Sequence, residues 1–205
     1  TSPASLEDFM AKVRQPFSRT AVGTAEGVIQ HRGDIGTKRL AIELSFQFSA
    51  NQAQATATLQ GGEVCTMVWR HGEPASARIV DQSRDDEPTL TQLGIKPEDL
   101  TFSFLFWKPV EERRRETVSG QPCRVIRLRN PHSEAEVMGW FSEKFLFPLR
   151  LEWYPDPDAN PDRVAEFTRF EKQEDGLWFI KTMLIRGRDW KTKLTLRKAN
   201  INVAE

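Results

Sequence analysis

The stretch Leu40-Ala-Ile-Glu-Leu-Ser-Phe-Gln-Phe48 determines the fold class, because its large apolar residues recur at every second position. The side chains of a β-strand point alternately to its two faces, so this spacing puts all the large apolar residues on one face. Polar residues such as Glu43 and Gln47 then occupy the other face. The stretch therefore predicts a long strand with one dry face and one wet face.

The same two-residue period continues through most of the chain. Small apolar residues alternate with polar ones from Ala53 to Leu59, and Gly61-Gly62 is a tight-turn signal before a returning run. Strand-like runs lie at residues 21–31, 39–49, 53–60, 64–70, 75–80, 113–118, 123–129, 136–141, 149–154, 164–172, 177–186 and 191–201. We expect about eleven strands, joined as antiparallel hairpins in one large curved sheet, which is a mainly β (α+β) fold.

The N-terminal segment predicts an amphipathic helix over residues 5–15. Ser5 is a suitable N-cap, and Pro16 cannot continue the helix. The apolar residues that recur on one face of this helix are Leu6, Phe9, Met10 and Val13.

The strand rhythm stops between residues 82 and 108. The polar stretch 81–87 predicts a loop, and Pro97 followed by two acidic residues is typical of a first helical turn. The side chains expected to share the face of this short helix are Leu100, Phe104 and Trp107.

The chain has 205 residues, and its 29 basic residues balance its 29 acidic ones. This length predicts a single domain over residues 1–205 with a core of useful size. The neutral balance gives no reason to expect nucleic acid as a partner, and no apolar run is long enough to span a membrane. Because the chain starts at Thr1, we expect an upstream segment such as a signal peptide to have been removed, or simply not included.

No sequence pattern predicts catalysis, a cofactor or a metal site. Hydrolase, zinc-protease, P-loop and dinucleotide-binding patterns are absent. His31, His71 and His132 lie beside turns and far apart, so each is expected to be a solvated turn residue. The acidic stretch 156–162 resembles the start of a calcium loop, but Pro161 replaces the required glycine, which favours a hairpin turn. An enzyme would need a site assembled from scattered residues.

Aromatic residues are the most informative part of the composition, with 13 Phe and 6 Trp against one Tyr. Two short helical segments can hardly cover the inner face of such a sheet. Either an apolar cavity that could hold a ligand remains on the concave face, or a second sheet layer fills the same space. The residues expected to line a cavity are Leu40, Ile42, Leu44, Phe46, Phe48, Met67 and Trp69.

The two cysteines, Cys65 and Cys123, lie in separate predicted strands and form no metal-binding motif. Buried free thiols are favoured, because neither cysteine lies in a core-poor segment that needs a bridge. A disulfide is the alternative if the chain is exported.

Several segments, in order, resemble the bacterial outer-membrane lipoprotein-sorting family, the LolA-like proteins. The similar segments are the helix at 5–13, the runs 100–107 and 116–128, the stretch 140–152 with Pro148-Leu149-Arg150, and the end at 175–183, 191–196 and 202–203. Together they cover most of the chain.

The resemblance implies an unclosed β-barrel with helices across its mouth as a lid. It also implies a periplasmic carrier, exported by means of a removed signal peptide, that shields lipoprotein acyl chains or another lipid and uses no cofactor. Its implied partners are an inner-membrane transporter and an outer-membrane acceptor. The candidate lid residues are Leu6, Phe9, Met10, Val13, Leu100, Phe104 and Trp107.

A second function fits the same fold. A lipid-responsive periplasmic sensor or interaction module would use lipid occupancy to control its binding to a protein partner. Lipid extracted from the purified protein argues for either function and against an enzyme.

Overall fold

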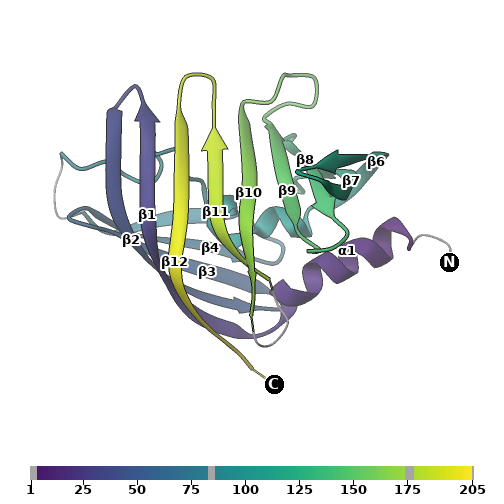
Figure 1. The fold of residues 1–205 in the computed structure, drawn as a ribbon, viewed down its shortest axis with the longest axis horizontal. Helices are drawn as coiled ribbons and strands as arrows, with labels where there is room; N and C mark the ends of the chain where they lie inside the picture. The colour runs from purple at the N-terminus through teal and green to yellow at the C-terminus, as the bar shows by residue number, and fades with distance from the viewer. Residues whose placement is uncertain (1–3, 83–85, 174–177, 205) are drawn as a thin grey trace.

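The computed structural model describes residues 4–82, 86–173 and 178–204. Within them lies one antiparallel sheet of twelve strands, with a helix near the N-terminus and short helical segments between β5 and β6 (Figure 1). The strands are β1 (Ala21–Gly33), β2 (Gly36–Ser49), β3 (Gln52–Leu59), β4 (Glu63–Arg70), β5 (Ser76–Gln82), β6 (Lys108–Val118), β7 (Gln121–Arg129), β8 (Glu136–Ser142), β9 (Pro148–Tyr154), β10 (Arg163–Lys172), β11 (Trp178–Arg186) and β12 (Lys191–Val203). The expected mainly β fold class is confirmed.

The first and last strands pair in the middle of the sheet. Consecutive strands pair with each other, except β5 and β6, which produces the order β5-β4-β3-β2-β1-β12-β11-β10-β9-β8-β7-β6. The sheet curves strongly, as Figure 1 shows. Its two outer strands, β5 and β6, do not pair with each other, so the sheet does not close into a barrel. This is the unclosed barrel that the family resemblance implies.

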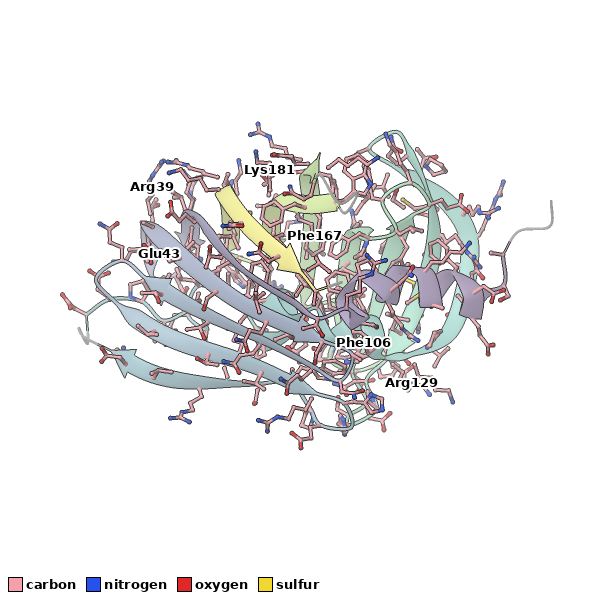
Figure 2. The ribbon with its side chains drawn as sticks, turned by 90° about the horizontal axis from the view of Figure 1, so that it is seen from below. Arg39, Glu43, Phe106, Arg129, Phe167 and Lys181 are labelled. Atoms are coloured by element: carbon pink, nitrogen blue, oxygen red, sulfur yellow. The ribbon has the colours of Figure 1, made fainter. Side chains whose placement is uncertain are left out.

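The strand β2 has the dry and wet faces that its sequence predicts. Ile42 and Leu44 are buried on the concave side of the sheet. Arg39 and Glu43 are exposed, and Figure 2 shows them at the periphery of the molecule.

A bulge in β12, opposite Glu26 and Gly27 of β1, contributes to the curvature. The pairing of β1 with β12 shifts by one residue between Glu26 and Gly27. A Cβ atom at Gly27 would lie only 2.2 Å from the carbonyl oxygen of Thr195, so only glycine fits there. Bulges bend the strand that carries them and increase its twist.

The helix α1 (Leu6–Arg14) begins and ends close to the positions that the sequence predicts. The hydroxyl of Ser5 accepts a hydrogen bond from the backbone N–H of Asp8 at 3.1 Å, which confirms the N-cap. A 3-10 turn, η1 (Gln15–Ser18), follows and contains Pro16.

The apolar run after Pro97 forms two short helical segments instead of one helix. The helix α2 (Pro97–Thr101) ends at Phe102, whose φ of 53° is left-handed, and the 3-10 turn η2 (Ser103–Phe106) follows. A left-handed residue turns the chain out of the helix, and the residue after η2 is already extended. The prediction of one shared helix face was therefore wrong for Leu100, Phe104 and Trp107.

The insertion between β5 and β6 fills much of the concave side of the sheet. Its buried apolar residues are Leu90, Leu93, Ile95, Leu100, Phe104, Leu105 and Trp107. Helix α1 adds Phe9, Met10 and Val13 to the same core. Part of the space that the sequence left open is thus filled by this insertion, and the described residues contain no second sheet layer.

Two boundaries differ from the sequence-based expectations. Asp81 and Gln82 belong to β5 and not to the loop expected at 81–87. Residues 83–85 of that loop lie outside the described residues. So do residues 175–177, where the segment expected at 175–183 and the strand expected at 177–186 begin. No helix within the described ranges is long and apolar enough to cross a membrane.

Candidate functional site

An apolar pocket of about 340 Å³ opens on the concave side of the sheet. Its walls come from both halves of the sheet and from the two helical segments that lie against it. The sheet contributes residues of β1, β2, β3, β10, β11 and β12. The other lining residues come from η1, from α2 with the adjoining Phe102, from the loop between β8 and β9, and from Gln173 after β10.

The strand β2 and its neighbours form one wall. Leu44, Phe46 and Phe48 project from alternate positions of β2 into the lining, as their spacing requires. Ala25 of β1 and Ala55 of β3 are small side chains in the same wall. Because these two positions carry only methyl groups, they leave space that larger residues would fill.

Packed aromatic rings form another part of the pocket wall. The ring centroid of Phe102 lies 5.4 Å from that of Phe17 and 5.4 Å from that of Phe147. In the same lining, Phe145 contacts Phe170 of β10 at 4.5 Å with nearly parallel ring planes. Such pairs stabilise each other by more than the burial of their surface alone, so this wall is well defined.

Two lining residues have a left-handed backbone. Phe102 has a φ of 53° and Leu146 a φ of 51°. Large residues seldom adopt this conformation, which costs of order 1 kcal/mol or more for each of them. Such strain is held by the surrounding packing, and here it lies in two of the non-sheet segments that line the pocket.

The insertion is tied to the sheet by buried polar contacts. The guanidinium of Arg163, the first residue of β10, is paired with the carboxylate of Asp99 in α2 at 2.5 Å. Farther along the insertion, the carboxylate of Glu63 accepts a hydrogen bond from the backbone N–H of Leu90 at 3.1 Å. These contacts hold α2, and with it one wall of the pocket, against the sheet.

Two arginines hold the N-terminal helix in place. Arg124 of β7 forms two hydrogen bonds to Glu112 of β6, at 2.6 and 2.8 Å, and donates a third to the carbonyl of Ala4. The bonds from Arg124 lower the pKa of Glu112 below its usual value. At the other end of α1, Arg14 donates to the carbonyl oxygens of Leu105 and Trp107. Burial lowers the pKa of Arg14.

The residues expected to line a cavity fall into three groups. Leu44, Phe46 and Phe48 are in the pocket lining. Ile42 and Met67 are fully buried in the packed core instead. Two residues lie outside the lining, Leu40 half-buried against the core and Trp69 stacked on Phe106 at 4.7 Å.

Of the residues proposed as a lid, Leu100 lies in the pocket lining. The others pack into or against the core rather than the lining, namely Leu6, Phe9, Met10, Val13, Phe104 and Trp107. The other lining residues from these segments are Pro16 and Phe17 of η1, Asp99 of α2, and Phe102, which follows α2.

Sequence reasoning missed the aromatic residues from the second half of the chain. These are Phe145, Phe147, Phe167, Trp178 and Phe179. The period-two pattern does place Phe167 on the apolar face of a strand. It does not indicate which side chains from distant strands lie close together in the folded sheet.

Cys65, Cys123 and His31 lie outside the pocket lining. Cys65 and Cys123 are free and buried, as predicted, and burial raises the pKa of both thiols. His31 is also buried, with Nδ1 2.7 Å from the hydroxyl of Thr192, so the expectation of a solvated His31 was wrong. The imidazole ring of His31 stacks on the indole ring of Trp190, with 6.2 Å between the ring centroids. No cluster of metal-binding residues occurs among the residues described.

Solved structures share this architecture. An outer membrane lipoprotein-sorting protein domain from Vibrio parahaemolyticus matches 94% of this chain and 91% of its own length, with a TM-score of 0.73 and 14% identity. A LolA superfamily protein from Nitrosomonas europaea matches 97% and 94%, with a TM-score of 0.63 and 11% identity. The fold is LolA-like.

A DUF1329 family protein from Desulfovibrio piger has the same LolA-like fold, with a TM-score of 0.74 at 12% identity over 94% of this chain and 90% of that one. At these identities the similarity concerns the fold. No protein-family model matches the sequence, and no curated protein sequence matches it significantly.

Proposed function

We propose that this protein is a periplasmic carrier that holds an acyl chain of a lipoprotein, or of another envelope lipid, in the apolar pocket. The observation that carries the proposal is the pocket itself, about 340 Å³ in volume and lined mainly by aromatic and aliphatic side chains. Ligand sites are typically concave and apolar, with volumes of roughly 300–1,000 Å³. The LolA-like fold supports the proposal, since one similar structure is described as a lipoprotein-sorting domain.

Burial of an alkyl chain provides the binding energy without a polar anchor. Each buried methylene contributes about 0.8 kcal/mol, so six methylenes would contribute about 5 kcal/mol before the cost of ordering the chain. The walls built from Phe46, Phe48 and Phe147 offer the contact surface for this burial.

Release requires that the pocket can change. The proposed lid consists of η1, α2 and the adjoining Phe102. Phe17, Leu100 and Phe102 line the pocket, and Phe17 also packs against Phe48 of β2, with 5.9 Å between ring centroids. A movement of α2 would relieve the left-handed strain at Phe102 and open that wall. Hand-off to an inner- or outer-membrane partner would then complete a transport cycle.

Lipid extraction followed by mass spectrometry tests the proposal. The protein is exported to the periplasm of a Gram-negative host and purified without detergent, alongside an Ala55→Leu variant whose larger side chain occupies the pocket. We expect lipid bound to the parent protein and much less in the variant. Absence of lipid from both proteins, combined with no uptake of an added lipid, would overturn the proposal.

A transfer assay separates a carrier from a sensor. Protein loaded with a fluorescent lipid is mixed with lipid vesicles, and transfer is followed by the loss of fluorescence quenching. A carrier gives up its lipid on the time scale of the assay, whereas a sensor that retains its lipid would contradict the transport part of the proposal.

A further inference from the structure

Two lysines interrupt the apolar lining of the pocket. Lys144 lies in the loop after β8, and its Nζ atom is 5.2 Å from the ring centroid of Phe145. Lys181 lies in β11 and is only partly buried. Figure 2 shows Lys181 at the boundary of the molecule and Phe167, another lining residue, in its middle. The ammonium groups therefore lie where the apolar lining meets solvent.

Among the described residues that line the pocket, none offers a free carboxylate to these lysines. Asp99 is the one carboxylate among the described lining residues. Its Oδ2 atom is 2.5 Å from Arg163 and also accepts a hydrogen bond from the backbone N–H of Lys96. Because Asp99 is committed to these buried partners, the charge that the pocket presents to a ligand is positive.

The carboxylates close to the two lysines can be displaced or are already paired. Lys181 lies 2.6 Å from Glu171, whose side chain is 54% exposed, and an ion pair this exposed is weak. Glu143, next to Lys144 in sequence, is paired with Arg115 at 2.8 Å. Lys144 has no ion-pair partner among the residues that the structure describes. Glu174 and Asp175 follow in sequence but lie outside those residues.

The size of the pocket limits the apolar part of the ligand. Its volume of about 340 Å³ is a little over twice that of a cavity of about 150 Å³ that holds one benzene molecule. That space accommodates one alkyl chain and not a bundle of chains.

The geometry points to a single-chain amphiphile with an anionic headgroup, a carboxylate or a phosphate, as the class of ligand that the pocket selects. Its alkyl chain would lie against Phe46 and Phe147, and its headgroup would accept hydrogen bonds from Lys144 and Lys181 at the mouth. This inference rests on the proposed lipid-binding function and adds headgroup selectivity to it. Bonds between ammonium and carboxylate or phosphate groups are among the stronger polar contacts that proteins form.

Competition for a neutral fluorescent probe tests the selectivity. Delipidated protein is loaded with Nile red, which reports only on the apolar pocket, and four competitors with the same alkyl chain are added. These are dodecanoate, dodecyl phosphate, dodecanol and dodecylammonium. We expect both anions to displace the probe at concentrations about tenfold lower than dodecylammonium requires, with the alcohol between them.

Three variants connect the selectivity to the two lysines. A Lys144→Gln and Lys181→Gln double variant should bind Nile red like the parent but lose most of its preference for the anions. Glu171→Gln frees Lys181 from its ion pair and should strengthen dodecanoate binding about threefold. Lys193→Gln, an exposed lysine of β12 outside the pocket, is the matched control and should change neither.

The outcomes separate this inference from the function on which it rests. If Nile red and all four competitors fail to bind, the pocket is not a lipid site and both proposals fall. If Nile red binds, but anionic, neutral and cationic competitors displace it equally, the lipid-binding function stands and headgroup selectivity is overturned. A preference for anions that the double variant retains also overturns the assignment to Lys144 and Lys181.

Discussion

Arg163 and Asp99 form an ion pair with 2.5 Å between Nη1 and Oδ2, although their side chains are only 4% and 2% exposed. The guanidinium also lies 4.8 Å from the ring centroid of Trp153. Asp99 belongs to α2 and Arg163 begins β10, so this pair joins the insertion to the sheet at the edge of the pocket.

Removal of one partner of this pair should destabilise the protein strongly. Asp99→Leu or Arg163→Met leaves the other charge buried without its partner, and we expect each to reduce the free energy of unfolding by about 3–5 kcal/mol. The double variant buries no charge and should recover much of that loss. Urea denaturation of all three proteins measures the effect, and additive losses in the double variant would contradict this account.

The pair of Glu112 and Arg124 should make stability depend on pH. The hydrogen bonds from Arg124 lower the pKa of Glu112 from the usual 4.5. A group whose pKa is lower in the folded state stabilises the fold above its unfolded pKa, and that stabilisation is lost as the pH falls through the folded pKa. The stability difference between the parent and Glu112→Gln should therefore be largest at neutral pH and shrink below about pH 4. Glu134→Gln, at an exposed residue, serves as the control and should show no such pH dependence.

Enlargement of two neighbouring alanines on β3 should have opposite consequences. Ala55 lines the pocket, while Ala57 is buried in the packed core. Ala55→Leu should weaken Nile red binding at least about tenfold with a change in stability below about 1 kcal/mol, because the side chain fills empty space. Ala57→Leu should lower stability by about 1–3 kcal/mol and leave binding intact. Thermal melts and probe titrations of the same samples measure both effects. Equal effects in the two variants would contradict the assignment of Ala55 to the pocket wall and of Ala57 to the core.

A carboxylate on β2 should be tolerated at one position and not at the next inward-facing one. Leu44 lines the pocket, whereas Ile42 is only 1% exposed and packed. Leu44→Glu should fold and lose probe binding, because water can enter the pocket and hydrate the charge. Ile42→Glu should cost several kcal/mol and hinder folding, since its charge would have no partner. Severe destabilisation by Leu44→Glu, or unchanged probe binding, would argue against the cavity assignment.

The two thiols should be present but unreactive. Burial raises the pKa of Cys65 and Cys123, which keeps both protonated and shielded at neutral pH. We expect almost no alkylation of the native protein and two labelled thiols per chain after denaturation without reductant. Labelling that appears only after a reductant is added would reveal a disulfide instead.

Local patterns determined most of the fold in advance. The alternation from Leu40 to Phe48 marked β2, because a strand buried on one face needs apolar residues at every second position. The Ser5 hydroxyl marked the start of α1, because a helix needs acceptors for its first backbone N–H groups. These signals depend only on residues close in sequence, which is why they could be read without the structure.

The pocket could be placed only by the tertiary structure. The ring centroids of Phe17 and Phe147 lie 6.0 Å apart although the two residues are distant in sequence. Phe102 contacts both rings, and its left-handed backbone is indicated by no local pattern. The sequence by itself determined the sheet, the N-terminal helix and an apolar surplus too large for two helices to cover. Which inward-facing residues pack solidly, such as Ile42, and which border empty space, such as Leu44, depended on how far the insertion fills the concave face. That balance is set by contacts between segments distant in sequence, and the period of a strand carries no information about them.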